Sequence, residues 1–301
     1  MAHEHNHSLS QKKMGAAIAL NAVIFLVEIT AGLLTNSLAL VSDALHNLSD
    51  FFSLILSYLG AKVTLWDSNH KKTYGYVRVE IFVAFINSVS LVIIGGFIIF
   101  EAFKRLSDPE PVIGLWMLLA AVTGFVANVL ATLLLRNEAE HDLNSKSAYL
   151  HLLTDAVESL AVIIIGGLIY WLNWNILDPI ISVIIGIFII KSAWNVVMEA
   201  VNILTEGTPK GIDVKEVVKV ISSLPEVISI HHLHVWSLSS NIKALSAHVV
   251  IKDTLISEGN DVINRIGEEL EHKFKINHPT IQLESCECEN QGIVVNPNNL
   301  K

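Results

Sequence analysis

The chain has 301 residues, of which 52% are hydrophobic and only 16% are charged, whereas soluble domains carry about 25% charged residues. Its mean hydropathy is +0.52, and its net charge is −9 without a long basic cluster. These values exclude an ordinary soluble protein and a nucleic-acid partner. Charged residues are denser after residue 205 than before it. We therefore expect a membrane domain at 14–205, after a short tail at 1–13, and then a soluble domain.

Six apolar runs account for the first two thirds of the chain. A helix needs about 20 apolar residues to cross a bilayer core about 30 Å thick. We expect an all-α membrane domain with spans at residues 14–34, 38–63, 79–103, 113–135, 147–171 and 176–200. Lysine and arginine residues gather in the N-terminal tail and in the second and fourth connections. The positive-inside rule then places both termini in the cytoplasm.

The soluble part, residues 206–285, has the alternating patterns of an α+β domain. The predicted elements are a helix at 213–222, strands at 227–236 and 243–251, a helix at 257–274 with Ser257 as its N-cap, and a strand at 280–284. An αββαβ order with both helices on one face of the sheet predicts a small ferredoxin-like sandwich. Residues 286–301 form a C-terminal tail.

Spans two and five each carry a histidine and, four residues later, an aspartate. These are His46 with Asp50 and His151 with Asp155. Residues four apart lie on one helix face about 5–6 Å apart, so each span offers one imidazole and one carboxylate in one direction. Each motif occupies the middle span of a three-span half, as in transporters built from inverted repeats. Two such helices facing each other would make a four-ligand cage.

The donor set of that cage favours zinc. Two imidazoles and two carboxylates suit tetrahedral Zn²⁺, imidazole disfavours Mg²⁺ and Ca²⁺, and the carboxylates offset the ion's charge in hydrocarbon. A catalytic zinc keeps one position for water, whereas this set fills all four, which favours carrying the ion over using it. The alternatives are hydrogen-bonded pairs that neutralise themselves within each helix, an integral-membrane zinc metalloenzyme, and a membrane-bound zinc sensor.

Several segments together resemble the cation diffusion facilitator family, in its zinc-transporting branch. They are residues 37–50, Tyr74-Gly75-Tyr76, Arg78-Val79-Glu80, His151 to Asp155 and His234-Val235-Trp236. The resemblance implies a homodimer, and not an enzyme, that exports Zn²⁺ or other divalent cations from the cytoplasm in exchange for protons. It implies alternating access, with the histidine and aspartate pairs of spans two and five as the transport site. We expect this protein in the cytoplasmic membrane of a prokaryote.

The resemblance also implies a second metal site, in the soluble domain. His231, His248 and Glu284 fall where such relatives place zinc ligands, with His232, His234 and His278 nearby. The alternative is a set of strand histidines on a solvated face. Cys286 and Cys288 either join such a site or belong to a reduced tail, and His3, His5 and His7 either capture zinc or form a passive tail.

Other polar and small residues of the membrane part have less specific roles. Asp43 either orients a ligand, attracts ions at the entrance, or is a plain carboxylate at the start of its helix near the outer surface. The resemblance implies that Arg78 and Glu206 form a charge interlock between the membrane and soluble domains, and the alternative is two solvated charges. Asn21, Glu28, Asn87 and Asn128 are expected to form hydrogen bonds between helices, and Gly95-Gly96 and Gly166-Gly167 to allow close helix packing.

Overall fold

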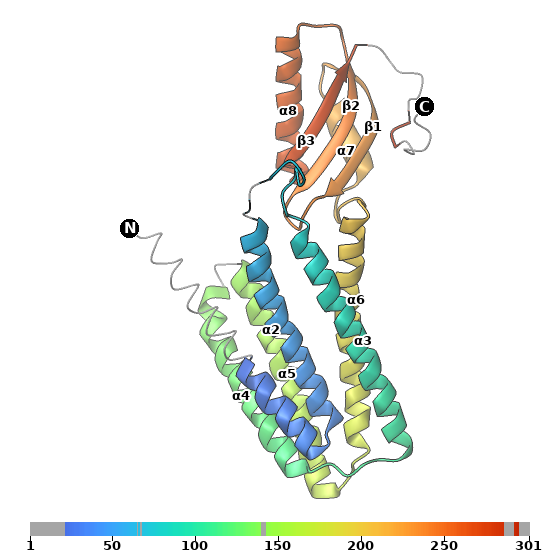
Figure 1. The fold of residues 1–301 in the computed structure, drawn as a ribbon. Coiled ribbons are helices and arrows are strands. Elements are labelled where there is room, and N and C mark those ends of the chain that lie inside the picture. Colours follow the sequence, from blue (N-terminus) through green and yellow to red (C-terminus); the bar gives the residue numbers. More distant parts are fainter. Residues whose placement is uncertain (1–21, 65, 67, 140–142, 286–291, 295–301) are drawn as a thin grey trace. The chain divides into compact units, whose positions relative to one another are not determined.

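A computed structural model describes residues 22–64, 66, 68–139, 143–285 and 292–294. Within the helices it describes the backbone alone at residues 50, 53–62, 64, 134–139, 143–148, 150 and 151. The chain divides into two units, Met1–Leu59 with Ile86–Val197 and Gly60–Phe85 with Met198–Lys301. The first unit is helical and the second contains a small sheet (Figure 1).

Long apolar helices occupy the chain up to residue 204. They are Ala22–Thr35, α2 (Leu38–Thr64), α3 (Val79–Ser107), α4 (Gly114–Ala139), α5 (Leu143–Leu172) and α6 (Leu177–Leu204). Four described segments are long and apolar enough to cross a membrane, namely Val79–Ser107, Gly114–Leu133, Leu152–Leu172 and Leu177–Leu204. The expected first span begins in residues that lie outside the described ones.

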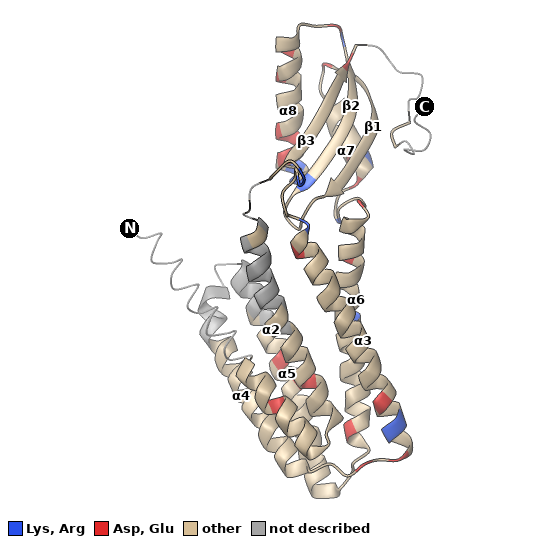
Figure 2. Cartoon of the chain, viewed as in Figure 1, with Lys and Arg blue, Asp and Glu red and all other residues tan. Residues whose placement is uncertain are grey.

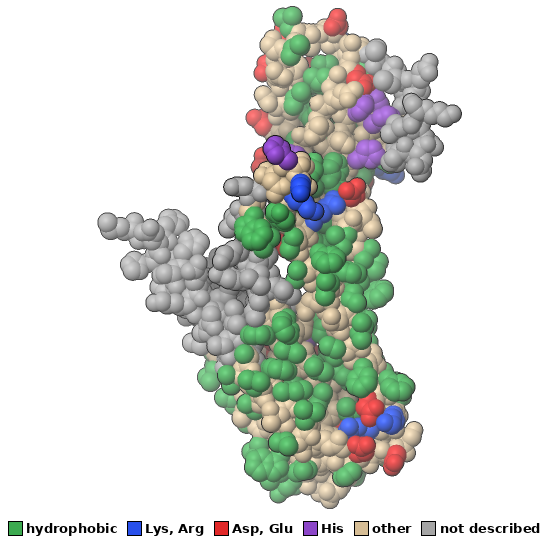
Figure 3. All heavy atoms as spheres, viewed as in Figure 1, with side chains coloured by type: hydrophobic (Ala, Val, Ile, Leu, Met, Phe, Trp, Pro, Cys, Tyr) green, Lys and Arg blue, Asp and Glu red, His purple; other side chains and the backbone are tan. Residues whose placement is uncertain are grey.

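The outward faces of these helices carry large apolar side chains. On α3, Ile93, Phe97 and Phe100 are each about two-thirds exposed, and Figure 3 shows hydrophobic side chains over the visible face of the helical unit. So much exposed apolar surface is unfavourable in water and favourable against lipid. The helical unit is therefore a multi-pass membrane domain.

Glycine residues bring two pairs of helices close together. A Cβ built on Gly95 of α3 would lie 3.3 Å from the carbonyl oxygen of Gly186 on α6, and one built on Gly186 would lie 3.4 Å from that of Gly95. A Cβ on Gly166 of α5 would lie 3.3 Å from the backbone of α4. Cβ atoms on Gly96 and Gly167 would meet no described atom within 4 Å. The expected packing role thus falls to the first glycine of each pair.

The first turn of α2 is capped by a carboxylate from another helix. Asp178, at the start of α6, is completely buried. It accepts hydrogen bonds from Ser37 Oγ at 2.5 Å, from the Leu38 amide at 2.8 Å and from the Ala39 amide at 3.2 Å. The first amides of a helix have no partner within it, and its N-terminus attracts negative charge. Asp178 therefore fixes the start of the helix that carries His46.

The second unit contains the elements of the soluble domain in the expected αββαβ order. They are α7 (Val214–Ser222), β1 (Val227–Ser237), β2 (Lys243–Ile251), α8 (Ile256–Phe274) and β3 (His278–Glu284). The sheet order is β1-β2-β3, with β1 antiparallel and β3 parallel to β2. One hydrophobic core joins both helices to the sheet, through Val217 and Ile221 of α7 and Ile266 and Leu270 of α8, among others.

The starts of the two helices in this unit differ from each other. Asp213 caps α7, because its side chain accepts a hydrogen bond from the Lys215 amide at 2.9 Å. The prediction of Ser257 as the N-cap of α8 is wrong, since this helix begins at Ile256, after Leu255, without a side-chain cap. A hydrogen bond from the Thr254 hydroxyl to the Glu258 carboxylate ties the preceding chain to the first turn instead.

Candidate metal sites

The membrane domain brings together a histidine of α2 and an aspartate of α5. His46 Nε2 lies 3.7 Å from Asp155 Oδ1. The Asp155 side chain is 5% exposed and that of His46 17%, and Figure 2 shows acidic positions within otherwise uncharged stretches of these helices. Ionisable groups inside a membrane are expensive and are associated with function. This contact joins the two helices, which self-neutralising pairs within each helix would not require.

The other two residues of the predicted cage follow the same helices. Asp50 lies one turn after His46 on α2, and His151 lies one turn before Asp155 on α5. Their side chains lie outside the described ones. The structure therefore places His46 of the first predicted pair beside Asp155 of the second. The complete set of four ligands stays a prediction.

Further polar side chains pack around this pair. Asn47 Nδ2 on α2 donates to Glu28 Oε2 on the helix Ala22–Thr35 at 2.7 Å, and Asn87 Nδ2 on α3 donates to Ser49 Oγ at 3.3 Å. These bonds between helices confirm the expectation for Glu28 and Asn87, while Asn21 lies outside the described residues. The amide of Asn128 is buried with no hydrogen-bond partner among the described residues.

Asp43 and Asn47 extend the polar face of α2. Asp43 is buried, and its Oδ2 has no hydrogen-bond partner in the described part of the chain. Its burial excludes a freely solvated position. No role was predicted for Asn47, although its place four residues after Asp43 puts it on the same helix face.

A second cluster lies on the three-stranded sheet. His231 on β1 pairs with His248 on β2, and Glu284 ends β3 beside them. Glu284 Oε2 lies 3.2 Å from His231 Nε2, and Oε1 lies 2.7 Å from His248 Nδ1. One ligand atom from each residue lies within 4.8 Å of the others. Two imidazoles and a carboxylate are ligands that zinc accepts, and three protein ligands leave one tetrahedral position.

The neighbouring histidines take different positions. His232 sits at a bulge of β1 with a φ of 50°, and its ring centroid lies 5.2 Å from that of His231 and 4.9 Å from that of His248. Its amide donates to the Gly292 carbonyl at 3.2 Å. His278 contacts Tyr74 edge to face at 5.7 Å between ring centroids. It begins β3, whereas Glu284 of the cluster ends that strand. Cys286 and Cys288 lie outside the described residues.

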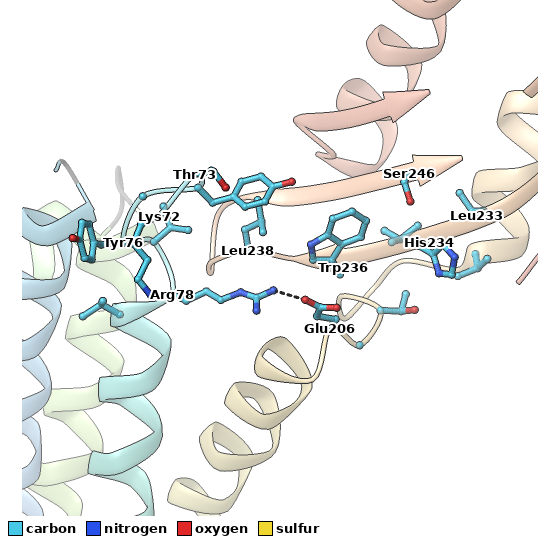
Figure 4. A pocket seen from close by; sticks show the side chains of 18 of the residues that line it. Lys72, Thr73, Tyr76, Arg78, Glu206, Leu233, His234, Trp236, Leu238 and Ser246 are labelled. Carbon is cyan, nitrogen blue, oxygen red and sulfur yellow. Dashed lines mark hydrogen bonds and ion pairs between the residues drawn. The ribbon is translucent and has the colours of Figure 1, made fainter. Parts of the chain in front are cut away.

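Arg78 and Glu206 form an ion pair in the second unit. Arg78 Nη2 lies 3.1 Å from Glu206 Oε1, and both side chains are more than one-third exposed. The pair lines a cavity of about 830 Å³. Figure 4 shows Trp236 and His234, both on β1, among the other residues that line it. The pair that the resemblance implies therefore exists, but exposed pairs contribute only about 0–1 kcal/mol.

Several membrane helices, with a histidine and carboxylate pair between two of them, are typical of a multi-pass transport protein for metal cations. Residues 14–205 match the cation efflux transmembrane domain, and residues 209–286 match the cytoplasmic domain of cation efflux proteins. The chain belongs to the cation efflux family, also called cation diffusion facilitators. It is a transmembrane cation efflux protein and not an enzyme, which removes the metalloenzyme alternative.

Curated relatives match nearly the whole chain. The chain is 38% identical to the cadmium, cobalt and zinc/H(+)-K(+) antiporter of Bacillus subtilis, over 95% of this chain and 92% of the relative. It is 35% identical to the zinc transporter ZitB of Pectobacterium atrosepticum, over 96% and 91%. It is 34% identical to the metal cation efflux system protein CzcD of Cupriavidus metallidurans, over 95% and 91%. The family resemblance seen in the sequence is confirmed.

Proposed function

We propose that this protein exports Zn²⁺ from the cytoplasm in exchange for protons, with His46, Asp50, His151 and Asp155 as the transport site. The contact of 3.7 Å between His46 and Asp155 carries this proposal, because it joins the two helices that hold the predicted ligands. The names of the relatives, which include a zinc transporter and a zinc/H(+)-K(+) antiporter, support zinc as cargo and protons as counter-ions.

The transport cycle follows from competition between zinc and protons for the same ligands. Zinc binds imidazole and carboxylate in their deprotonated forms. In the inward-facing state the four ligands take up zinc from the cytoplasm as they lose protons. In the outward-facing state protons displace the ion, and the protonated site returns. Zinc and protons each shift the balance between the inward-facing and outward-facing states only through their different affinities for these two states.

The finer architecture belongs to the same proposal. We infer six spans with both termini in the cytoplasm of a prokaryote, a membrane domain at 14–205 and a ferredoxin-like domain at 206–285, between tails at 1–13 and 286–301. The αββαβ order and the mixed sheet support the ferredoxin-like class. A homodimer is expected, with the cytoplasmic domain as its contact.

The sheet cluster fits a second, resident zinc ion. Its donor set of two imidazoles and one carboxylate suits zinc, and its ligand atoms already lie close together. His231, His248 and Glu284 would hold the ion, and zinc bound there would stabilise the sheet by linking all three strands. A membrane-bound sensor would need only this site, so it is the second candidate function.

Vesicles containing the purified protein separate these functions. Internal zinc and internal pH are recorded together after zinc is added outside. An antiporter moves zinc one way and protons the other, and an imposed pH gradient drives zinc against its own gradient. Zinc movement without proton counterflow would exclude antiport, and the absence of any saturable zinc movement would leave the sensor. Empty vesicles provide the control for leakage.

A further inference from the structure

Glu28 is a completely buried carboxyl in the helix Ala22–Thr35. One oxygen, Oε2, accepts the hydrogen bond of 2.7 Å from Asn47. The other, Oε1, has no hydrogen-bond partner among the described residues. It lies against Gly124 of α4 so closely that a Cβ at this glycine would collide with it. The carboxyl is thus enclosed by three helices, with only half of its hydrogen-bonding capacity used.

The position of Glu28 along the chain puts it level with the candidate transport site. The helix that carries it ends at Thr35 and α2 begins at Leu38, so the two helices form a hairpin. At 1.5 Å per residue, Glu28 lies about 10 Å before the turn and Asn47 about 13 Å after it. Their hydrogen bond agrees with this match in depth. Asn47 is the next residue after His46, so Glu28 is one residue removed from the site.

Several ionisable groups on neighbouring helices lie close enough to Glu28 to affect its charge. Glu28 is within electrostatic reach of Asp43 and His46, which lie on α2, and of Asp155, which lies on α5. Glu158 on α5 is within electrostatic reach of Asp43. The described residues of α4 that face it are uncharged. An ionised carboxylate with an unpaired oxygen is costly away from water, and nearby carboxylates repel a further negative charge. A divalent cation at the site reverses that balance, because it attracts the ionised form.

We propose that Glu28 carries a proton of the transport cycle, which it holds while the transport site is empty and releases when the metal binds. This inference rests on the proposed function of the site. The step is Glu28–COOH giving Glu28–COO⁻ and H⁺, with the proton leaving to the side on which the site is open. The reverse step accompanies release of the metal. Glu28 is not one of the proposed metal ligands, since Asn47 holds Oε2 and Oε1 lies against Gly124 of α4.

A purely structural role for Glu28 predicts a different effect of Glu28→Gln on proton coupling. A glutamine would accept the same hydrogen bond from Asn47 and would carry no charge into the membrane. If Glu28 served only to join two helices, Glu28→Gln would leave proton coupling unchanged. The ionisable group is therefore what the experiment must isolate.

The test counts protons released when zinc binds. The full chain is purified in detergent and kept in weakly buffered solution with a pH indicator. Every chain, including the reference, carries His248→Ala to remove binding at the sheet cluster. We expect Glu28→Gln to bind zinc within about tenfold of the reference affinity, or about 1.4 kcal/mol, while releasing close to one proton fewer per zinc. Glu28→Asp, which keeps an ionisable group, restores the missing proton. Glu110→Gln, which changes an exposed glutamate between α3 and α4, leaves the count unchanged.

Two results would overturn the inference. One is an equal proton count for Glu28→Gln and the reference chain. The other applies even if that variant does not fold, because the unsubstituted residue can be observed by infrared spectroscopy. If zinc binding removed no carboxylic-acid band from the reference chain, Glu28 would not be losing a proton. Failure of the proposed function is a separate result, since it requires that vesicles with the unsubstituted chain move zinc without proton counterflow.

Discussion

The two clusters of histidine and carboxylate differ in what sets the distance between their ligands. On the sheet, hydrogen-bonded strands hold His231, His248 and Glu284 in register, so the backbone fixes the site. In the membrane domain, His46 and Asp155 belong to different helices, 3.7 Å apart, and only side-chain packing sets that distance. The ligands of a site between helices can move apart or together as the helices move, whereas hydrogen-bonded strands keep the ligands of the sheet site at a fixed distance. The helical site is therefore better suited to releasing its ion, and the sheet site to retaining it.

The largest expected effect comes from removing a carboxylate from the helical site. Asp155→Ala leaves a cage with surplus positive charge when zinc binds. Changing groups that merely support a metal ligand costs about 10–100-fold in affinity, so losing a ligand is expected to lower zinc flux by about 100-fold or more. Flux into vesicles measures this, with dimerisation and expression retained. Asp108→Ala removes an exposed aspartate after α3 and serves as the matched control. Substantial saturable flux in Asp155→Ala would exclude the site.

The second effect concerns selectivity at the same site. His46→Asp replaces an imidazole with a harder oxygen ligand, and carboxylates suit Mn²⁺ better than imidazoles do. Transport of Mn²⁺ relative to Zn²⁺ is therefore expected to rise, as measured by competition in vesicles. The same ion ranking before and after the change would mean that His46 does not contact the ion.

A smaller effect on transport is expected from the sheet cluster. His248→Ala removes one of three ligands, so the full chain binds one zinc ion fewer while flux persists. Stabilisation by zinc at this site, about 2.7 kcal/mol at a free concentration 100 times the Kd, disappears from thermal unfolding curves. His272→Ala, at an exposed position of α8, is the control. If His248→Ala abolished transport, the contrast between a releasing and a retaining site would be wrong.

The smallest effect is on the surface of the second unit. The hydrogen-bonded guanidinium of Arg265, 2.8 Å from Glu226, holds the pKa of that carboxyl below its usual value. A lowered pKa stabilises the folded state above the ordinary glutamate pKa, near 4.3, and this contribution is lost as the pH falls through the folded-state value.

Arg265→Ala should therefore lower the Tm of the metal-free full chain slightly at pH 7. The difference should vanish in acid below the glutamate range. Lys252→Ala, which removes an exposed lysine after β2, controls for the loss of one positive charge. A difference that grew toward acid pH would have the wrong sign for this ion pair.

Patterns along the chain predicted most of the elements, because each depends on local hydropathy or alternation. The strand at Lys243–Ile251 and the end of α8 at Phe274 are as expected. The spacing of four residues, repeated in His46–Asp50 and His151–Asp155, also predicted that the helices of spans two and five face each other. Such features repeat at fixed intervals, so a single sequence reveals them.

Features that depend on contacts across the fold could not be predicted in the same way. Asp178 caps a helix that begins 140 residues earlier, and nothing near Leu38 indicates its partner. The left-handed backbone of His232 follows from a bulge in the strand pairing, which alternation alone does not show. The hydrogen bond of Asn47 to Glu28 depends on how deep each residue lies in a hairpin, so it needs the exact helix ends.

The cap on α2 has a mechanical consequence. Three hydrogen bonds attach the first turn of α2 to Asp178 of α6, so this end of the helix acts as a fixed pivot. His46 lies about 12 Å from the pivot and Thr64 about 39 Å from it. Any tilt of α2 therefore moves its far end about three times as far as it moves the histidine. A leverage of this kind lets a change of a few ångströms at the far end alter the ligand distance by only about one.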